Sequence, residues 1–277
     1  MAKEDTILKS VKDIRQNAPG VGAYKIWLML TSTLGRSFMP GRDSFFQILA
    51  RNNLMLPPRK KKHTTNSNHR FHKWKNLIKG LQPLKANQLW VSDITYISLA
   101  DGDVCYLHLI TDAYSHKIIG WKLARTLRVC ETLDALNQAI EDALQTTGTN
   151  DLEGLIHHSD RGIQYCCDQY VNKLHEYKIK ISMTEDYKPT DNAIAERING
   201  IIKAETSYNK RPFSDYDEAL KLISEYINFY NNKRPHMSIG HKIPAVVHRQ
   251  EEGLQEKRWK NKVYISKSDN KSVTSRP

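Results

Sequence analysis

The stretch HHSDRGIQYCCDQYVNKLHEYKIKISMTEDYKPTDNAIAERINGIIKAE (residues 157–205) decides the fold expected for this chain. Asp160 follows a short apolar segment with strand character, and Glu196 lies in the first turns of a segment with helical pattern. Thirty-five residues separate these two acids. Upstream, Asp93 lies within LWVSDITYI (89–97), which has strong strand character. Three carboxylates on a strand, a strand end and a helix can converge on one point, and such hard oxygen ligands suit Mg²⁺ or Mn²⁺.

The region from residue 87 onward mixes strands and helices. Three strands joined by tight turns come first, and a helix, a strand, a helix and a strand follow before two final helices. The predicted strands are 89–99, 104–112, 117–123, 155–158 and 179–183, and the predicted helices are 131–146, 168–177, 193–209 and 215–232. This order predicts an α/β fold with a mixed five-stranded sheet and flanking helices.

Five stretches resemble a known family and follow one another in the family order. They are WVSDITYI (90–97), LITDAYSHKIIGW (109–121), HHSDRGIQY (157–165), DNAIAERINGIIKAE (191–205) and YNNKRPHMSIGHKIPA (230–245). Together with the carboxylate spacing they resemble the catalytic core of retroviral integrases and bacterial insertion-sequence transposases. The resemblance is closest to the second reading-frame product (OrfB) of the IS-three family.

This resemblance implies a ribonuclease H-like fold in which the first strand lies beside the fourth, so that Asp93 and Asp160 are neighbours. It implies that Asp93, Asp160 and Glu196 are catalytic and hold two Mg²⁺ or Mn²⁺ ions. Asp93 would bridge the ions, and Asp160 and Glu196 would each hold one. The implied enzyme is a DNA transposase, a polynucleotidyl transferase. It would cut strands at the element ends with water and then join them with a DNA 3′-hydroxyl, by a copy-out, paste-in route.

The same resemblance implies the partners of the chain. The substrates would be double-stranded DNA, both the terminal inverted repeats of the element and the target. The protein would act as a homo-oligomer on DNA. A first reading-frame product would supply a helix-turn-helix and a leucine zipper, as a separate chain or as a frameshift fusion. This sequence has no run of three or more heptads, so that zipper is not encoded here.

Positive charge is concentrated in the first third of the sequence. Residues 1–84 hold 16 Lys and Arg against 4 Asp and Glu, whereas residues 85–277 hold 26 of each. A basic module attached to a neutral one is typical of a nucleic-acid-binding module joined to a catalytic domain. Segments 6–16, 22–34 and 43–53 have helical period and are separated by turns. Residues 1–56 are therefore predicted to be a small helix-turn-helix-like DNA-binding domain, and an ordinary helical hairpin is the alternative.

Residues 57–86 are predicted to be a basic linker. They contain the predicted DNA contacts Arg59, Lys60, Lys61, Lys62, Lys73 and Lys75. Phe71 and Trp74 alternate with the basic residues, a mixture that suits phosphates and exposed bases. The alternative is a solvated linker whose two aromatic rings dock on the core. Residues 87–249 are predicted to form the catalytic core, and residues 250–277 a charged tail with no assigned function.

The helix that carries Glu196 predicts further DNA contacts. Lys203 lies seven residues after Glu196, which is nearly two turns and ~10 Å along the same face. That face also carries Asn199 and Gly200, whereas Ile198, Ile201 and Ile202 lie on the other side. We predict that Lys203 contacts the DNA backbone or terminal bases and places the scissile phosphate on the metal ions, and that Asn199 also contacts DNA. For Lys203 the alternative is a solvated lysine that pairs with a nearby acid. Arg234, within YNNKRPH (230–236), is a further predicted DNA contact.

Several classes of protein are excluded by what the sequence lacks. It has no signal-peptide pattern at its start and no apolar run near the ~18 residues of a membrane span, so a cytoplasmic protein is expected. It has no P-loop and no CxxC pair. Two alternatives remain open. One is a non-catalytic DNA-binding regulator or domesticated integrase-like protein, against which the three acids argue. The other is a plain ribonuclease H-like nuclease, against which the basic first third argues.

Overall fold

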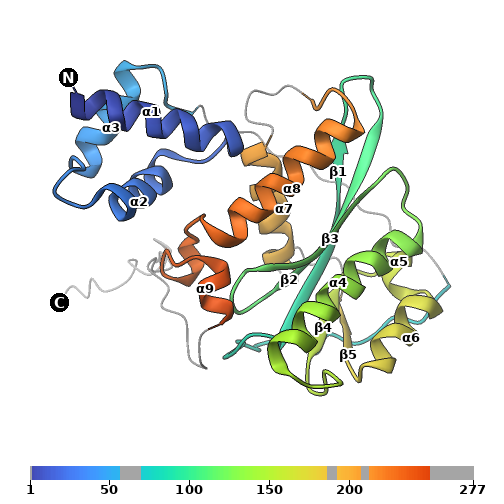
Figure 1. Cartoon of the computed structure of the whole chain (residues 1–277). Helices are drawn as coiled ribbons and strands as arrows, with labels where there is room; N and C mark the ends of the chain where they lie inside the picture. Colours follow the sequence, from blue (N-terminus) through green and yellow to red (C-terminus); the bar gives the residue numbers. More distant parts are fainter. Residues whose placement is uncertain (1, 57–69, 186–191, 207–211, 250–277) are drawn as a thin grey trace, which may run out of the picture.

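A computed structural model describes residues 2–56, 70–185, 192–206 and 212–249. Its centre is a five-stranded sheet in the order β3-β2-β1-β4-β5 (Figure 1). The strands are β1 (Leu89–Ser98), β2 (Val104–Asp112), β3 (Ile118–Ala124), β4 (Ile156–Ser159) and β5 (Lys180–Met183). β1 pairs with β2 antiparallel and with β4 parallel. The predicted mixed α/β sheet, with the first strand beside the fourth, is therefore confirmed.

Helices cover both faces of the sheet (Figure 1). One face packs against α4 (Val129–Thr147), α5 (Ile163–Cys166) and α6 (Asp168–Glu176), and the other packs against α7 (Ala193–Thr206) and α8 (Tyr216–Asn232). In α4 the buried side chains recur at helical spacing, so one stripe of the helix faces the sheet. β1 is covered on both faces because its side chains alternate between the two cores. Both hydrophobic cores thus hold Asp93 on a rigid central strand.

Three N-terminal helices confirm the predicted helical segments to within a few residues. They are α1 (Ala2–Asn17), α2 (Ala23–Leu34) and α3 (Arg42–Arg51). Their buried side chains, such as Val11 and Ile26, belong to the same hydrophobic cluster as Ile202 of α7 and Tyr226 of α8. The N-terminal helices and the helix that carries Glu196 therefore share one core. The predicted domain boundary near residue 56 stays a prediction, but these helices do not pack around a core of their own.

The turn between α1 and α2 contacts the backbone of α7. The amide of Gly20 donates to the carbonyl of Glu205 over 2.8 Å. A Cβ at position 20 would lie 2.1 Å from the carbonyl oxygen of Ala204. Only glycine can approach the neighbouring backbone this closely, so Gly20 fixes how near the N-terminal helices come to α7.

Replacing Gly20 with alanine is expected to destabilise the protein by at least about 2 kcal/mol, because backbone atoms must move to admit the methyl group. The matched control is Gly22→Ala, two residues further along, where an added Cβ meets nothing within 4 Å. Urea unfolding of both variants measures the difference. Equal unfolding midpoints for the two variants would contradict the close approach.

Part of the predicted linker lies on the core. Residues 72–77, called the strap below, run beside β5, where the amide of Met183 donates to the carbonyl of Lys75 over 3.3 Å. Trp74 packs against the core, as the alternative reading of the linker predicted for both aromatics, whereas Phe71 is 38% exposed. The strap also covers the edge of β5, which would otherwise present unpaired backbone groups. Arg59–Lys62 and the tail 250–277 lie outside the described residues.

The sequence patterns missed three short elements. They are α5, the 3₁₀ turn η1 (Met237–Ile239) and α9 (Pro244–His248). Elements this short show little periodicity, which explains the omission. Among the described residues, no helix is long and apolar enough to cross a membrane.

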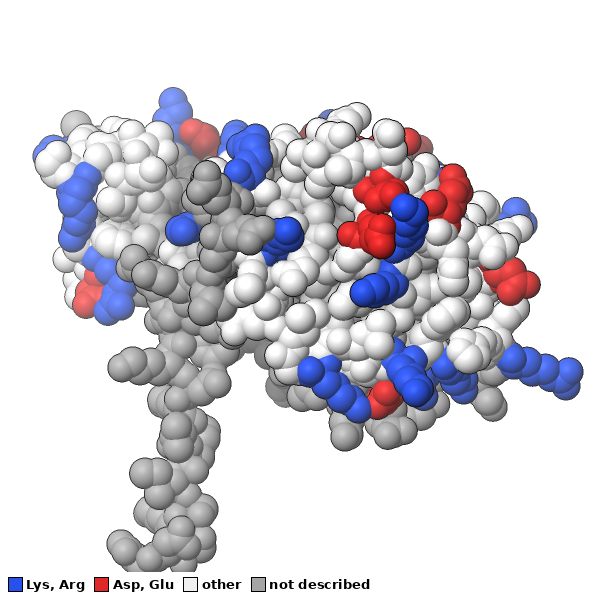
Figure 2. Space-filling view, turned by 90° about the horizontal axis from the view of Figure 1, so that it is seen from below, with Lys and Arg blue, Asp and Glu red and all other residues white. Residues whose placement is uncertain are grey.

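Charged side chains are unevenly spread on the surface. On the face shown in Figure 2, acidic side chains gather mainly on the right-hand part of the molecule, where basic side chains are also present. The helical part at the left carries mostly Lys and Arg. On this face, the charge imbalance found along the sequence is therefore also seen in space.

Candidate active site

Asp93 lies in the middle of β1 and points toward α7. Its Oδ2 accepts a hydrogen bond from Asn199 Nδ2 over 2.7 Å, and its Oδ1 accepts one from the amide of Ile94 over 2.9 Å. Asn199 is buried, and its amide therefore fixes the orientation of the Asp93 carboxylate. The side chain of Asn199 faces the acid, and its predicted contact with DNA stays a prediction.

Asp160 follows the last residue of β4, at the end of the strand next to β1. Its Oδ1 accepts a hydrogen bond from the amide of Gly162 over 2.9 Å. A Cβ at position 162 would lie 2.9 Å from that same oxygen, so glycine leaves the carboxylate room to turn back on the chain. Parallel pairing of Val91 with His158 places the end of β4 beside Asp93.

Glu196 lies in the first turn of α7 and is exposed. The start of this helix is tied to β1, because Asn192 Nδ2 donates to the carbonyl of Ser92 over 2.9 Å. Ile198 and Ile202, on the opposite side of the helix, are fully buried against the sheet. Burial of that apolar side orients Glu196 and Asn199 toward the surface of β1 that carries Asp93.

Asp160 and Glu196 both act electrostatically on Asp93. Burial, and then the charge of Asp160, raise the pKa of Asp93 to about 7, although the hydrogen bonds from Asn199 and Ile94 lower it. The charge of Glu196 also raises this pKa. Such mutual repulsion requires the carboxylates to be neighbours, and a cation between them would relieve it.

The donor set fits a hard divalent cation, although the ligand shell is not closed. In the described part of the chain, no three His, Cys, Asp or Glu side chains are grouped tightly enough to hold a metal ion. Asp93 and Asp160 are nevertheless adjacent acids whose charges repel each other, and Glu196 is an exposed carboxylate on the facing helix. Oxygen-only ligands of this kind suit Mg²⁺ or Mn²⁺.

Lys203 lies on α7 beyond Glu196 and Asn199, and it is partly buried. Burial lowers its pKa below the ordinary value, while the charge of Asp93 acts in the opposite direction. The lysine is therefore within the electrostatic field of the acid, as its position on the helix predicts. Its contact with DNA stays a prediction.

Arg234 does not face the surface and is unavailable to DNA. It is 1% exposed, and its Nε and Nη2 donate to the two oxygens of Glu205, each over 2.8 Å. Lys25 of α2 and the hydroxyl of Tyr226 also contact Glu205, over 3.0 and 2.8 Å. The prediction that Arg234 contacts DNA is therefore wrong, because its guanidinium is committed to a buried carboxylate. Its position joins the N-terminal helices, α7 and α8.

Lys73 and Lys75 are exposed on the strap and line a pocket beside β5. Their contact with DNA stays a prediction. The roles of Asn199 and Glu205 were missed because nothing in the sequence shows which polar residue will meet a distant acid. The separation of 106 residues between Asn199 and Asp93 illustrates this.

The sheet order and an aspartate on its central strand, with a second at the end of the neighbouring strand and a glutamate on the covering helix, define an integrase-core protein of the ribonuclease H-like class. Two family models, both described as integrase core domain, match residues 83–189 and 177–244. A transposase for insertion sequence element IS629 from Shigella sonnei is 30% identical over 245 residues, 88% of this chain and 79% of that protein. The chain belongs to the family of insertion-sequence transposases with an integrase core, which is consistent with the IS-three family.

Other comparisons agree with this placement. A putative transposase for insertion sequence element IS986/IS6110 from Mycobacterium tuberculosis (strain ATCC 25177 / H37Ra) is 35% identical over 164 residues. The match covers 59% of this chain and 58% of the mycobacterial protein, so it spans little more than half of that relative. A chain in the cryo-EM structure of a simian T-cell lymphotropic virus intasome in complex with PP2A regulatory subunit B56 gamma has a TM-score of 0.51 at 17% identity. The alignment covers 87% of this chain and 75% of that chain. This likeness supports the fold.

Proposed function

We propose that the protein is a DNA transposase that cuts one strand at the ends of its element. The released 3′-hydroxyl then attacks a second phosphodiester, so that one P–O bond forms as another breaks and a new 3′-hydroxyl leaves. The single observation that carries this proposal is the proximity of three acids in an integrase-core fold: Asp93 on β1, Asp160 directly after β4 and Glu196 on α7. Relatives of this chain are named transposases. A copy-out, paste-in route is the finer form of this proposal.

The residues of the chain have distinct roles in the proposed reaction. Asp93, Asp160 and Glu196 would hold two Mg²⁺ or Mn²⁺ ions, which when bound supply activation of the attacking oxygen and stabilisation of the leaving oxygen. Asn199 keeps the Asp93 carboxylate in one orientation through its 2.7 Å hydrogen bond. The rigid strand, strand end and helix fix the separation of the acids, so that little reorganisation accompanies the reaction.

The proposed substrates are the terminal inverted repeats and the target DNA, bound by a homo-oligomer of this chain. A first reading-frame product, separate or fused, is a further proposed partner. The test supplies the protein and Mg²⁺ with a donor plasmid that carries the element ends. Circular junctions between the two ends are the expected product. A protein that binds the ends and never cuts them under these conditions would instead be a regulator.

We expect Lys203→Ala to slow end cleavage by roughly tenfold or more, because a charged hydrogen bond to the scissile strand is lost. Cleavage is measured with labelled end fragments at limiting DNA and moderate salt. Lys203→Arg is the matched variant: it keeps the charge and is expected to keep part of the activity. Normal cleavage and joining by the alanine variant would contradict the predicted contact.

A further inference from the structure

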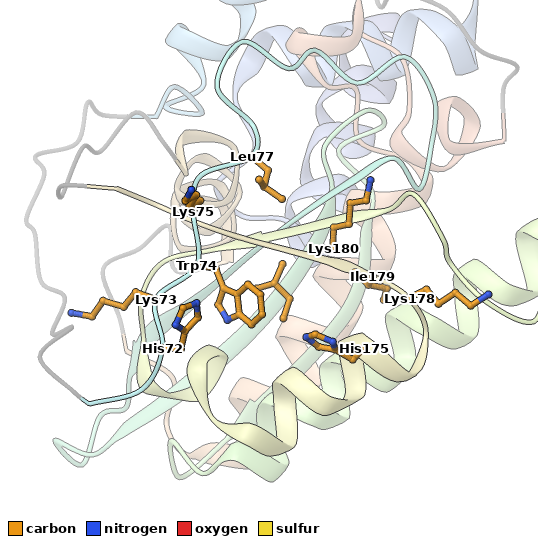
Figure 3. A pocket seen from close by; sticks show the side chains of 10 residues that line it. His72, Lys73, Trp74, Lys75, Leu77, His175, Lys178, Ile179 and Lys180 are labelled. Carbon is orange, nitrogen blue, oxygen red and sulfur yellow. The ribbon is translucent and has the colours of Figure 1, made fainter.

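A pocket of about 600 Å³ lies along the outer edge of the sheet, formed by the strap, the end of α6 and the start of β5 (Figure 3). Its floor is apolar. Trp74 lies half-buried against the core, and Ile179 and Ile181 line the wall. The rings of His72 and His175 lie 4.9 and 5.7 Å from that of Trp74, measured between centroids. An aromatic floor of this kind accepts a flat ring.

The rim of the pocket is positively charged. Lys73, Lys75 and Lys180 are exposed there, and no Asp or Glu is among the lining residues. In Figure 3 the four lysine side chains lie around the central rings, with Lys73 and Lys178 extending to opposite sides. Lys178 contributes least, because it already pairs with the carboxylate of Asp151 over 2.6 Å. Three lysines around an apolar floor suit a ligand with a flat apolar part and several negative charges.

The pocket is separate from the three acids but extends toward them. The charges of Lys73 and Asp160 both act on Cys166, the last residue of α5. Lys73 and Asp160 therefore both lie near this short helix. From there the pocket follows β5, the strand at the opposite edge from β3. A strand of nucleic acid lying in the pocket would therefore lead away from the loop that carries Asp160.

We propose that this strap pocket holds an unpaired nucleotide of a single DNA strand beside the active site. The base stacks on Trp74, and the flanking phosphates are bound by Lys73, Lys75 and Lys180. The volume is suitable for one nucleotide, and the combination of an aromatic platform with a cationic rim is how proteins bind single strands without regard to sequence. A base in an intact duplex cannot enter. The inference rests on the proposed function in one respect, since the strand end made by cleavage can fray and so supply unpaired nucleotides.

The test measures binding of the full chain to a labelled single-stranded oligonucleotide of about twelve nucleotides, by fluorescence anisotropy. The variant Lys75→Ala/Lys180→Ala removes two rim charges. At 0.1 M salt we expect its affinity to fall by at least about tenfold, and the slope of log affinity against log salt to fall by about 1.4, or 0.7 for each lost phosphate contact. The matched control, Lys221→Ala/Lys233→Ala, removes two exposed lysines on the α8 side of the sheet and should leave the slope unchanged.

A second variant tests the base-stacking part. Trp74→Leu keeps an apolar side chain against the core and removes the aromatic platform. The wild type should bind the intact oligonucleotide about tenfold more tightly than one in which abasic sites replace the bases, and Trp74→Leu should lose that preference. Equal affinity of the wild type for both oligonucleotides overturns the stacking. If the lysine variant has the same salt slope as the wild type, the pocket does not bind DNA, and a protein partner becomes the alternative occupant.

These outcomes are independent of catalysis. Asp93→Asn should bind the oligonucleotide as the wild type does, because Asp93 lies on β1 and does not line the pocket. Failure to cut element ends would therefore reject the transposase proposal without changing the binding result. Loss of the binding difference, with normal cutting, would reject the strap pocket alone.

Discussion

Replacing Asp93 by asparagine is expected to lower the rate of end cleavage by roughly 10³-fold or more, while binding of the element ends stays nearly unchanged. The amide keeps the shape of the side chain but loses the charge that would hold a divalent cation. Losses of this size are typical when a group essential to the reacting centre is removed. Asp160→Asn and Glu196→Gln are expected to behave in the same way, because each removes one carboxylate from the same site.

Stability provides an independent measurement on the same variant. Burial and the charge of Asp160 both disfavour the Asp93 carboxylate, so its neutral replacement should unfold at the same temperature as the wild type or higher. The control is Asp101→Asn, an exposed acid in the turn after β1, which should cleave normally. Wild-type cleavage by Asp93→Asn would remove this residue from the proposed site, whereas a collapsed fold would show that Asp93 is structural.

Replacing Arg234 by methionine is expected to cost about 3–5 kcal/mol of folding free energy. The change leaves the carboxylate of Glu205 in the interior with its strongest partner gone, and an uncompensated buried charge is among the most destabilising of single changes. Lys25 and Tyr226 still contact Glu205, so part of the compensation remains. Urea unfolding measures the loss, with Arg42→Met as the matched control because Arg42 and its partner Asp43 are exposed.

A second substitution separates the charge effect from lost packing. In Arg234→Met/Glu205→Met both members of the pair are apolar, and much of the lost stability is expected to return. No recovery in the double variant would show that packing, rather than the orphaned charge, explains the loss. The pKa of Glu205 adds a pH test. Burial raises this pKa, but Arg234 and Lys25 lower it by more than burial raises it, so that the pKa of Glu205 is about 2.

The sign of that pH dependence follows from the lowered value. Since the folded pKa lies below the ordinary value near 4.5, the pair stabilises the protein fully above pH 4.5, and this stabilisation is lost as the pH falls toward 2. In the double variant the decline between these pH values should be shallower than in the wild type.

Much of the core was predictable because its signals are local. β1 and β2 are long and rich in branched side chains, and α4 and α8 show clear helical period, so their bounds were predicted to within two residues. The carboxylates on β1, after β4 and on α7 were proposed from their spacing and from the resemblance, and the fold brings them near one another. Their metal ions and their catalytic role stay predictions.

Contacts between distant segments were not predictable in this way. Glu205 meets Arg234 across 29 residues and Lys25 across 180, and no periodicity encodes such pairs. Arg234 was therefore predicted to contact DNA, although its guanidinium is buried. The strap was similarly described as a linker because its composition is polar, whereas Trp74 and its backbone bonds attach it to the core.

The close contact between Gly20 and α7 limits how a transposase of this kind can acquire a new DNA recognition sequence. If the N-terminal helices recognise the element ends, a new recognition sequence cannot be acquired by exchanging residues 1–56 alone with a relative. The incoming helices would have to bring a glycine at the same turn and a lysine for Glu205, or α7 and α8 would have to be exchanged with them. Chimeric proteins joined after α8 should therefore be more stable than chimeric proteins joined near residue 56. In this chain, the N-terminal helices and the helix that carries Glu196 would therefore have to be exchanged as one unit.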